Sequence, residues 1–252
     1  MSKDVSNYDF VVVLISRAIE LAKKGLIDEA IHILNKAVEL ADAIEDIPNK
    51  FSAFLQLARA YMFVGDKEKA RELLESINEE LGEKEFTEYT LYRLIIRIEK
   101  IRLKVEYPSD LKKELEDIRH RFEDLISGSG GNRDVLRYYL AFIIIIWAPE
   151  MAEIDIEYVE KTLREIVERH KCLQSDPQYA ELLTLLAEIH VKMGKEEQAL
   201  EELKEALRIY SGNASYSGEA IRDILLFARK YLPTKYGEIL NYLRDNTSAS
   251  SG

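Results

Sequence analysis

The stretch LTLLAEIHVKMGKEEQALEELKEA, residues 183–206, decides the fold class of this chain. Its apolar residues recur at helical spacing on both sides of Gly194, which predicts two amphipathic helices joined by a tight turn. The same spacing recurs in FLQLARAYMFVGDKEKARELLESI, residues 54–77, and in residues 14–37. Because such a unit buries its apolar face only against neighbouring copies, the sequence predicts a stacked array of helical hairpins.

The three copies share four positions around the turn. An alanine precedes the turn, a glycine stands at the turn, and an alanine and a leucine follow it. We expect the alanines where paired helices approach most closely, the leucines in the groove toward the next hairpin, and the glycines in a left-handed conformation. These residues are Ala18, Gly25, Ala30 and Leu34; Ala58, Gly65, Ala70 and Leu74; and Ala187, Gly194, Ala199 and Leu203.

With Phe54, Leu57 and Tyr61 added in the second copy, this order of residues resembles the tetratricopeptide (TPR) repeat. The first copy departs from the family pattern at Arg17 and Leu21, and the proline that usually closes a repeat is missing. The resemblance implies an all-α, right-handed superhelix of about six TPR-like hairpins, or roughly twelve helices. It also implies a protein-interaction scaffold that holds a peptide or helix of a partner in its concave groove.

The spacing between the copies leaves room for further, divergent hairpins and predicts the following organisation. Hairpins 1–3 occupy residues 1–126, and hairpins 4–6 occupy residues 133–245. Residues 127–132, SGSGGN, are predicted to be a flexible linker, because glycine and serine favour open chain. Residues 246–252 have no apolar anchor and are predicted to be a disordered tail. The helix after the linker is predicted to end at Pro149, because proline interrupts a helix.

Composition narrows the function class. The net charge is −11, whereas a general nucleic-acid binder carries an excess of basic residues, so no nucleic-acid partner is expected. The one cysteine cannot form an intrachain disulfide, which is typical of a reducing, cytoplasmic compartment. The most apolar run, residues 138–148, is shorter than the about 20 residues of a membrane span, so no membrane partner is expected. Abundant Glu, Lys, Arg and Ile with few Gln suggests a thermophilic prokaryote or archaeon.

The sequence shows no recognisable catalytic, metal-binding or phosphate-binding motif. The four histidines lack metal-ligand spacing with one another, and SGSGGN lacks the lysine and hydroxyl residue of a phosphate-binding loop. The sequence therefore predicts no catalytic residues, no metal site and no cofactor, and a protein that is not an enzyme.

The TPR resemblance implies that a ligand contacts the first helix of each hairpin, between the core positions. Arg59, Lys100 and Arg137 come from successive hairpins and would form a basic strip that suits an acidic or phosphorylated peptide. An ordinary solvated face explains the same residues. The predicted peptide-binding residues are Arg59, Tyr89, Tyr92, Arg93, Ile96, Lys100, Arg137, Tyr138, Glu181 and Glu188. Ile144 and Thr184 occupy equivalent positions, and Arg97 lies at the border.

The Ile-rich run AFIIIIW, residues 141–147, leaves a second interpretation open. A helix that is apolar all round is either buried by its neighbours or presents an interface. The alternative function is therefore self-association, as a homodimer or a structural or regulatory assembly, through the fourth hairpin.

Overall fold

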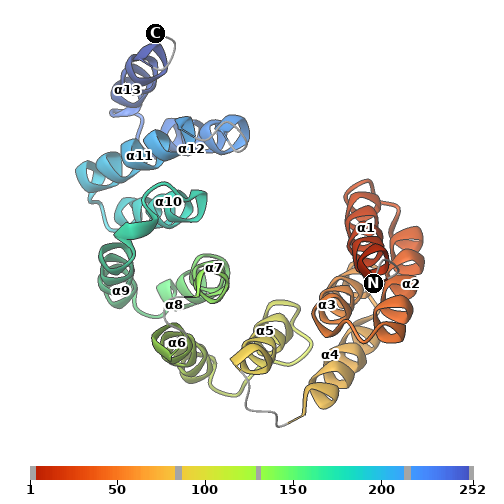
Figure 1. Cartoon of the computed structure of the whole chain (residues 1–252). Coiled ribbons are helices and arrows are strands. Elements are labelled where there is room, and N and C mark those ends of the chain that lie inside the picture. Colours follow the sequence, from red (N-terminus) through yellow and green to blue (C-terminus); the bar gives the residue numbers. More distant parts are fainter. Residues whose placement is uncertain (1–3, 83–86, 129–131, 213–216, 250–252) are drawn as a thin grey trace. The chain divides into compact units, whose positions relative to one another are not determined.

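The computed structural model describes residues 4–82, 87–128, 132–212 and 217–249, and these residues form helices and turns without a β-strand (Figure 1). Contacts divide the chain into two compact units, residues 1–135 and 136–252. The division falls inside a helix, three residues after the predicted linker. Residues 127 and 128 of that linker close a helix, Asn132 accepts a hydrogen bond from the Asp134 amide at 2.9 Å, and residues 129–131 lie outside the described part.

Unit 1 is built from consecutive hairpins. Each of the first four helices packs against the next, and the fifth contacts both preceding helices as well as the sixth. The bounds are α1 Asp4–Lys23, α2 Ile27–Ala43, α3 Ile47–Phe63, α4 Lys67–Leu81, α5 Thr87–Arg102 and α6 Leu111–Gly128.

Unit 2 continues the pattern, with α9, α10 and α11 packed in chain order and α12 and α13 both against α11. The bounds are α7 Arg133–Phe142, η1 Ile143–Trp147, α8 Ala148–Ala152, α9 Ile156–Arg169, η2 Lys171–Leu173, α10 Pro177–Lys192, α11 Glu196–Ser211, α12 Ser217–Tyr231 and α13 Tyr236–Ala249. Because α7, η1 and α8 run on without a break, the described residues form the twelve helices that the spacing predicts, apart from the short η2.

The repeat residues have the burial and the backbone conformation that the sequence predicts. The alanines on both helices of the three clear hairpins are fully buried, and the three leucines that follow are at most 2% exposed. Gly25, Gly65 and Gly194 have φ of +79°, +85° and +72°, which confirms the left-handed turns. At each of these turns, the amide of the next residue bonds a carbonyl five residues earlier, as from Lys195 to His190 at 2.8 Å.

The divergent third hairpin uses the same turn without a glycine. Lys104 has φ +54°, and the Val105 amide donates to the Lys100 carbonyl at 3.1 Å, which is the bond found at the other turns. The first helix of this hairpin therefore ends by the same mechanism as in the clear copies. The turn residue of this hairpin therefore carries a side chain where the clear copies have glycine.

Two expected helix ends lie elsewhere in the structure. Pro149 does not end its helix: the chain stays helical from Arg133 to Ala152 because residues 143–147 form a π-helix, with the Ala148 amide bonded to the Ile143 carbonyl. The wider turn precedes the proline and relieves the clash with the preceding turn. At the C-terminus α13 reaches Ala249, so residues 246–249 of the predicted tail are helical, and residues 250–252 lie outside the described part.

Candidate peptide-binding site

The predicted basic residues of unit 1 already have carboxylate partners. Arg59 on α3 donates two hydrogen bonds to Glu99 on α5, from Nη2 to Oε1 at 2.6 Å and from Nε to Oε2 at 3.2 Å. The Glu99 side chain is only 5% exposed, and Arg102 donates to it as well, at 3.1 Å. Arg59 therefore neutralises a buried carboxylate and ties two helices together.

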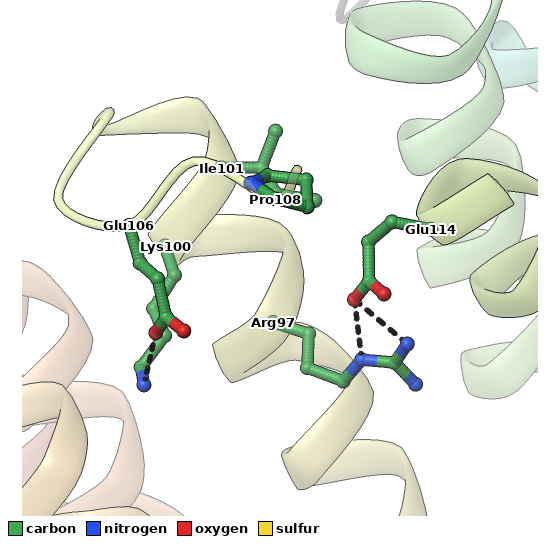
Figure 2. Close-up of a pocket in the computed structure, with 6 residues that line it drawn as sticks. All are labelled: Arg97, Lys100, Ile101, Glu106, Pro108 and Glu114. Carbon is green, nitrogen blue, oxygen red and sulfur yellow. Dashed lines mark hydrogen bonds and ion pairs between the residues drawn. The ribbon is translucent and has the colours of Figure 1, made fainter. Parts of the chain in front are cut away.

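Arg97 and Lys100 are engaged in the same way (Figure 2). Arg97 donates to Glu114 and to Asp117, each at 2.8 Å, and the bond to Asp117, with help from Arg121, holds the pKa of Asp117 below its ordinary value. Lys100 donates to Glu106 at 2.7 Å. We call Arg59, Arg97 and Lys100 the basic face of unit 1.

A hollow of about 240 Å³ lies beside this face, with Ile101 and Pro108 between the two ion pairs that Figure 2 shows. An acidic peptide entering it would have to displace carboxylates that are already in place. The hollow therefore gives little support to the acidic ligand that the sequence suggested.

The other predicted residues of α5 hold the unit together. Tyr92 stacks on Phe51 of α3 with ring centroids 4.3 Å apart, and Tyr89 meets Tyr92 edge-on at 6.5 Å. Arg93 donates to the Gly82 carbonyl. Ile96 is 1% exposed and belongs to the core, because α5 is covered by helices on several sides, so it is not available to a ligand in this structure.

Arg137 and Tyr138 lie in α7. An Arg137 Nη atom is 3.8 Å from Asp176, whose carboxylate caps α10 through the Gln178 amide, and the Arg137 carbonyl accepts from the Gln178 side chain at 3.3 Å. The Tyr138 side chain is exposed. Arg137 belongs to unit 2 and the other two cations of the proposed strip to unit 1, so a strip across all three stays a prediction.

The predicted residues of α10 do share a hollow. Glu181, Thr184 and Glu188 lie at helical spacing along one face of α10 and line a groove of about 440 Å³ within unit 2. We call it the α10 groove. Its other lining residues are Ile144 on the π-helix, Pro149 on α8, Leu185 on α10, Tyr210 on α11, and Ala220, Asp223, Ile224 and Phe227 on α12.

The sequence pointed to only part of this lining. Ile144 and the residues of α10 occupy the positions that the repeat resemblance marks. The contribution of α12 was missed, because its residues match no clear repeat copy. An amphipathic pattern in α12 was visible, but the pattern does not tell which neighbour that face meets.

The electrostatics of the α10 groove are set by carboxylates. Burial raises the pKa of Glu181, and Asp176 adds to the effect. Burial also raises the pKa of Glu188, and Lys192 opposes it. In the part of the chain that the structure describes, neither side chain makes a hydrogen bond or an ion pair. Burial likewise raises the pKa of Tyr210 on the groove wall.

A contrasting cluster lies inside unit 2. His190, one of the four histidines, is fully buried, with Nδ1 2.6 Å from Glu202 of α11 and Nε2 3.0 Å from Glu160 of α9. Each of these contacts needs a proton between its two atoms. Burial alone would raise the pKa of Glu160, but hydrogen bonds from His190, Arg164 and Lys195 outweigh it and lower the pKa to about 2. The cluster therefore ties three successive helices together.

Comparison with known proteins agrees with this geometry. Two models of the tetratricopeptide repeat match the chain, one at residues 51–79 and one at residues 169–218. These two stretches of the chain are therefore TPR-like helical repeats.

A crystal structure of nearly identical TPR-like repeats, from a Podosopora anserina protein described as a kinesin light chain, is similar in fold. The TM-score is 0.53 at 19% identity, and the match covers 80% of this chain and 95% of that chain. No curated protein matches. The matched models coincide with the second and fifth hairpins, where the repeat residues are clearest.

Two further properties bear on function. Among the described residues, no group of three or more His, Cys, Asp or Glu side chains could hold a metal ion. The continuous helix Arg133–Ala152 is long and apolar enough, by length and composition, to cross a membrane, although the apolar run alone is not. Buried core helices of soluble proteins pass the same test, and 56% of the apolar window of this helix is buried.

Proposed function

We propose that this protein is an interaction scaffold that holds a peptide segment of a partner protein in the α10 groove. TPR repeats generally mediate protein–protein interactions, and their fold is typically a non-enzymatic scaffold. The observation that carries the proposal is the convergence of Glu181, Thr184 and Glu188 on one hollow. The TPR resemblance marks these positions as ligand contacts, and the hollow gives a ligand a place to lie.

The size and lining of the groove suit a few side chains of a peptide. Ligand sites are typically about 300–1,000 Å³ with apolar walls and a few polar groups, and the α10 groove has this character. Ile224 is nearly fully buried, and Leu185 is also buried, so both form a firm floor. The π-helix places Ile144 on the wall, which is a role that π-turns often take at functional sites.

The test is to fill the groove. Thr184 is half-buried and lines the hollow, so Thr184→Trp should occupy it, while Thr184→Ser leaves the space and the hydroxyl in place. Random peptides displayed on phage are selected on the wild-type chain and then tested on both variants. We expect the selected peptides to lose binding to Thr184→Trp and to keep it with Thr184→Ser. Selected peptides that bind both variants equally would place the binding site elsewhere.

Self-association through the Ile-rich helix is the second candidate, and one observation favours it. The buried interpretation accounts for Ile143, Ile146 and Trp147, which are at most 6% exposed, but Ile145 is 59% exposed. Tyr138, seven residues earlier on the same continuous helix, is 46% exposed. Sedimentation velocity at micromolar concentration tests this candidate: a strict monomer removes it, and a dimer should be lost in Ile145→Lys.

A further inference from the structure

We propose that the α10 groove takes a cationic segment of its partner, in which Lys or Arg residues flank apolar side chains. This inference rests on the proposed function and names the chemistry of the ligand. It replaces an acidic ligand with a basic one.

The charges around the groove are all negative. Glu181 and Glu188 stand on α10, and Asp223 stands on α12, which forms another part of the lining. No lysine, arginine or histidine lines the groove. Arg222 comes within 3.7 Å of Asp223, but this pair is exposed and contributes little. A ligand in this groove would therefore meet carboxylates on more than one side.

The two glutamates of the groove lack ion-pair partners among the described residues. Several buried and half-buried carboxylates elsewhere in the described residues have a cation close by, as Glu99 has Arg59 and Glu160 has Lys195. Among the described residues, neither the exposed Glu181 nor the half-buried Glu188 has an ion pair or a hydrogen bond, and the loss of surrounding water disfavours their charged forms. A bound ammonium or guanidinium group would supply the missing partner.

An apolar floor lies between the charges of the groove. Leu185 lies between Glu181 and Glu188 along α10, and Ile224 and Phe227 approach from α12. An apolar side chain of the ligand can rest there while its neighbours reach the carboxylates. A small cation without apolar groups would leave this floor uncovered, so the lining favours a peptide.

The spacing of the two glutamates along α10 suits an extended peptide. Glu181 and Glu188 are seven residues apart on one helix, which corresponds to about 10 Å along its axis. An extended, polyproline-like segment repeats its face every three residues, over about 9 Å. The groove therefore fits an extended segment with two basic residues three positions apart and apolar residues between them. An acidic segment would instead place like charges together.

The experiment compares three synthetic peptides, each with blocked ends and the same apolar residues. The two outer positions carry Lys in the first, Gln in the second and Glu in the third. Binding to the full chain is measured by fluorescence polarisation and by calorimetry. We expect the Lys peptide to bind roughly tenfold more tightly than the Gln peptide, since two partly exposed charge pairs are involved. We expect the Glu peptide to bind least.

A matched pair of variants locates the effect. Glu181→Gln/Glu188→Gln should weaken the Lys peptide roughly tenfold and leave the Gln peptide nearly unchanged. Glu157→Gln/Glu165→Gln removes the same net charge from exposed positions on α9 outside the groove, and should change binding less than about twofold. Equal weakening by both double variants would show a general charge effect and overturn the inference.

The remaining outcomes separate this inference from the proposed function. If the Glu peptide binds most tightly, and Thr184→Trp abolishes that binding, the groove is a peptide site and the cationic ligand is wrong. If the Lys peptide binds but Thr184→Trp leaves it unchanged, both fail, because the site lies elsewhere. If none of the three peptides binds, the inference fails, and the phage selection decides the proposed function by itself.

Discussion

The basic face of unit 1 and the α10 groove of unit 2 differ in how their charges are satisfied. On the basic face, Arg59, Arg97 and Lys100 each have a carboxylate within 2.8 Å. In the groove, Glu181 and Glu188 have no such partner among the described residues, and burial raises both pKa values. The difference teaches that like charges close together in a sequence are available to a ligand only where the fold leaves them unpaired.

The largest expected effect tests whether the unit 1 charges are structural. Arg59→Met should destabilise unit 1 by about 3 kcal/mol, because it leaves the buried Glu99 carboxylate with Arg102 alone. Urea unfolding followed by circular dichroism, with amide hydrogen exchange in α3 and α5, measures the change. The double variant Arg59→Met/Glu99→Met should recover most of the loss. A loss below about 0.5 kcal/mol in the single variant would mean that Arg59 is free to bind a ligand.

The second prediction compares a paired carboxylate of unit 2 with the unpaired ones. Glu160→Gln should cost about 2 kcal/mol at pH 7, because the carboxylate accepts hydrogen bonds from His190, Arg164 and Lys195. The pKa of Glu160 is lowered from 4.5 to about 2 in the folded chain, so its contribution is present above pH 4.5 and is lost as the pH falls toward 2.

Fluorescence of Trp147, which is fully buried in unit 2 and is the single tryptophan, reports this unfolding transition. The wild type and Glu160→Gln should converge in stability as the pH falls through this range. A difference that stays constant down to pH 2 would show that the side chain acts through packing and not through charge.

The third prediction is that removing the unpaired carboxylates does not lower the stability of the chain. Glu181→Gln/Glu188→Gln should leave the unliganded chain as stable as the wild type or more stable by up to about 0.5 kcal/mol at pH 7. Both folded pKa values are raised, so the penalty for ionising these groups is present above the raised values and is absent below about pH 4.5. Thermal unfolding at several pH values measures it. A clear loss of stability at pH 7 would reveal a structural role and weaken the comparison.

The smallest effect concerns Lys100. Its partner Glu106 is 62% exposed, so Lys100→Met should change stability by less than about 0.5 kcal/mol. The same urea experiment measures it, with Arg59→Met as the reference for a buried pair. If Lys100→Met lost as much stability as Arg59→Met, the Lys100–Glu106 ion pair would have to be less exposed to solvent than it is in the structure.

The sequence by itself determined the repeat and its chemistry. Ala58, Gly65 and Leu74 recur at a fixed spacing, and helical periodicity together with the demand for close approach at alanine leads directly to stacked hairpins. The resemblance to the TPR repeat, which the same residues carry, implied that Glu181, Thr184 and Glu188 share one face of a first helix. Helical periodicity and side-chain size suffice to predict these positions, because each repeat residue packs mainly within its own hairpin and against the neighbouring hairpins.

Only the tertiary structure decided which charges are available. Glu99 lies 40 residues after Arg59, and Asp223 lies 35 residues after Glu188, so no local pattern reveals that the first two meet or that the last two line one groove. Pro149 shows the same limit, because the sequence pattern gave no sign of the π-helix that carries the chain through it. Pairing and burial depend on neighbours that are distant in the chain, and these decide whether a charged residue holds the fold together or faces a ligand.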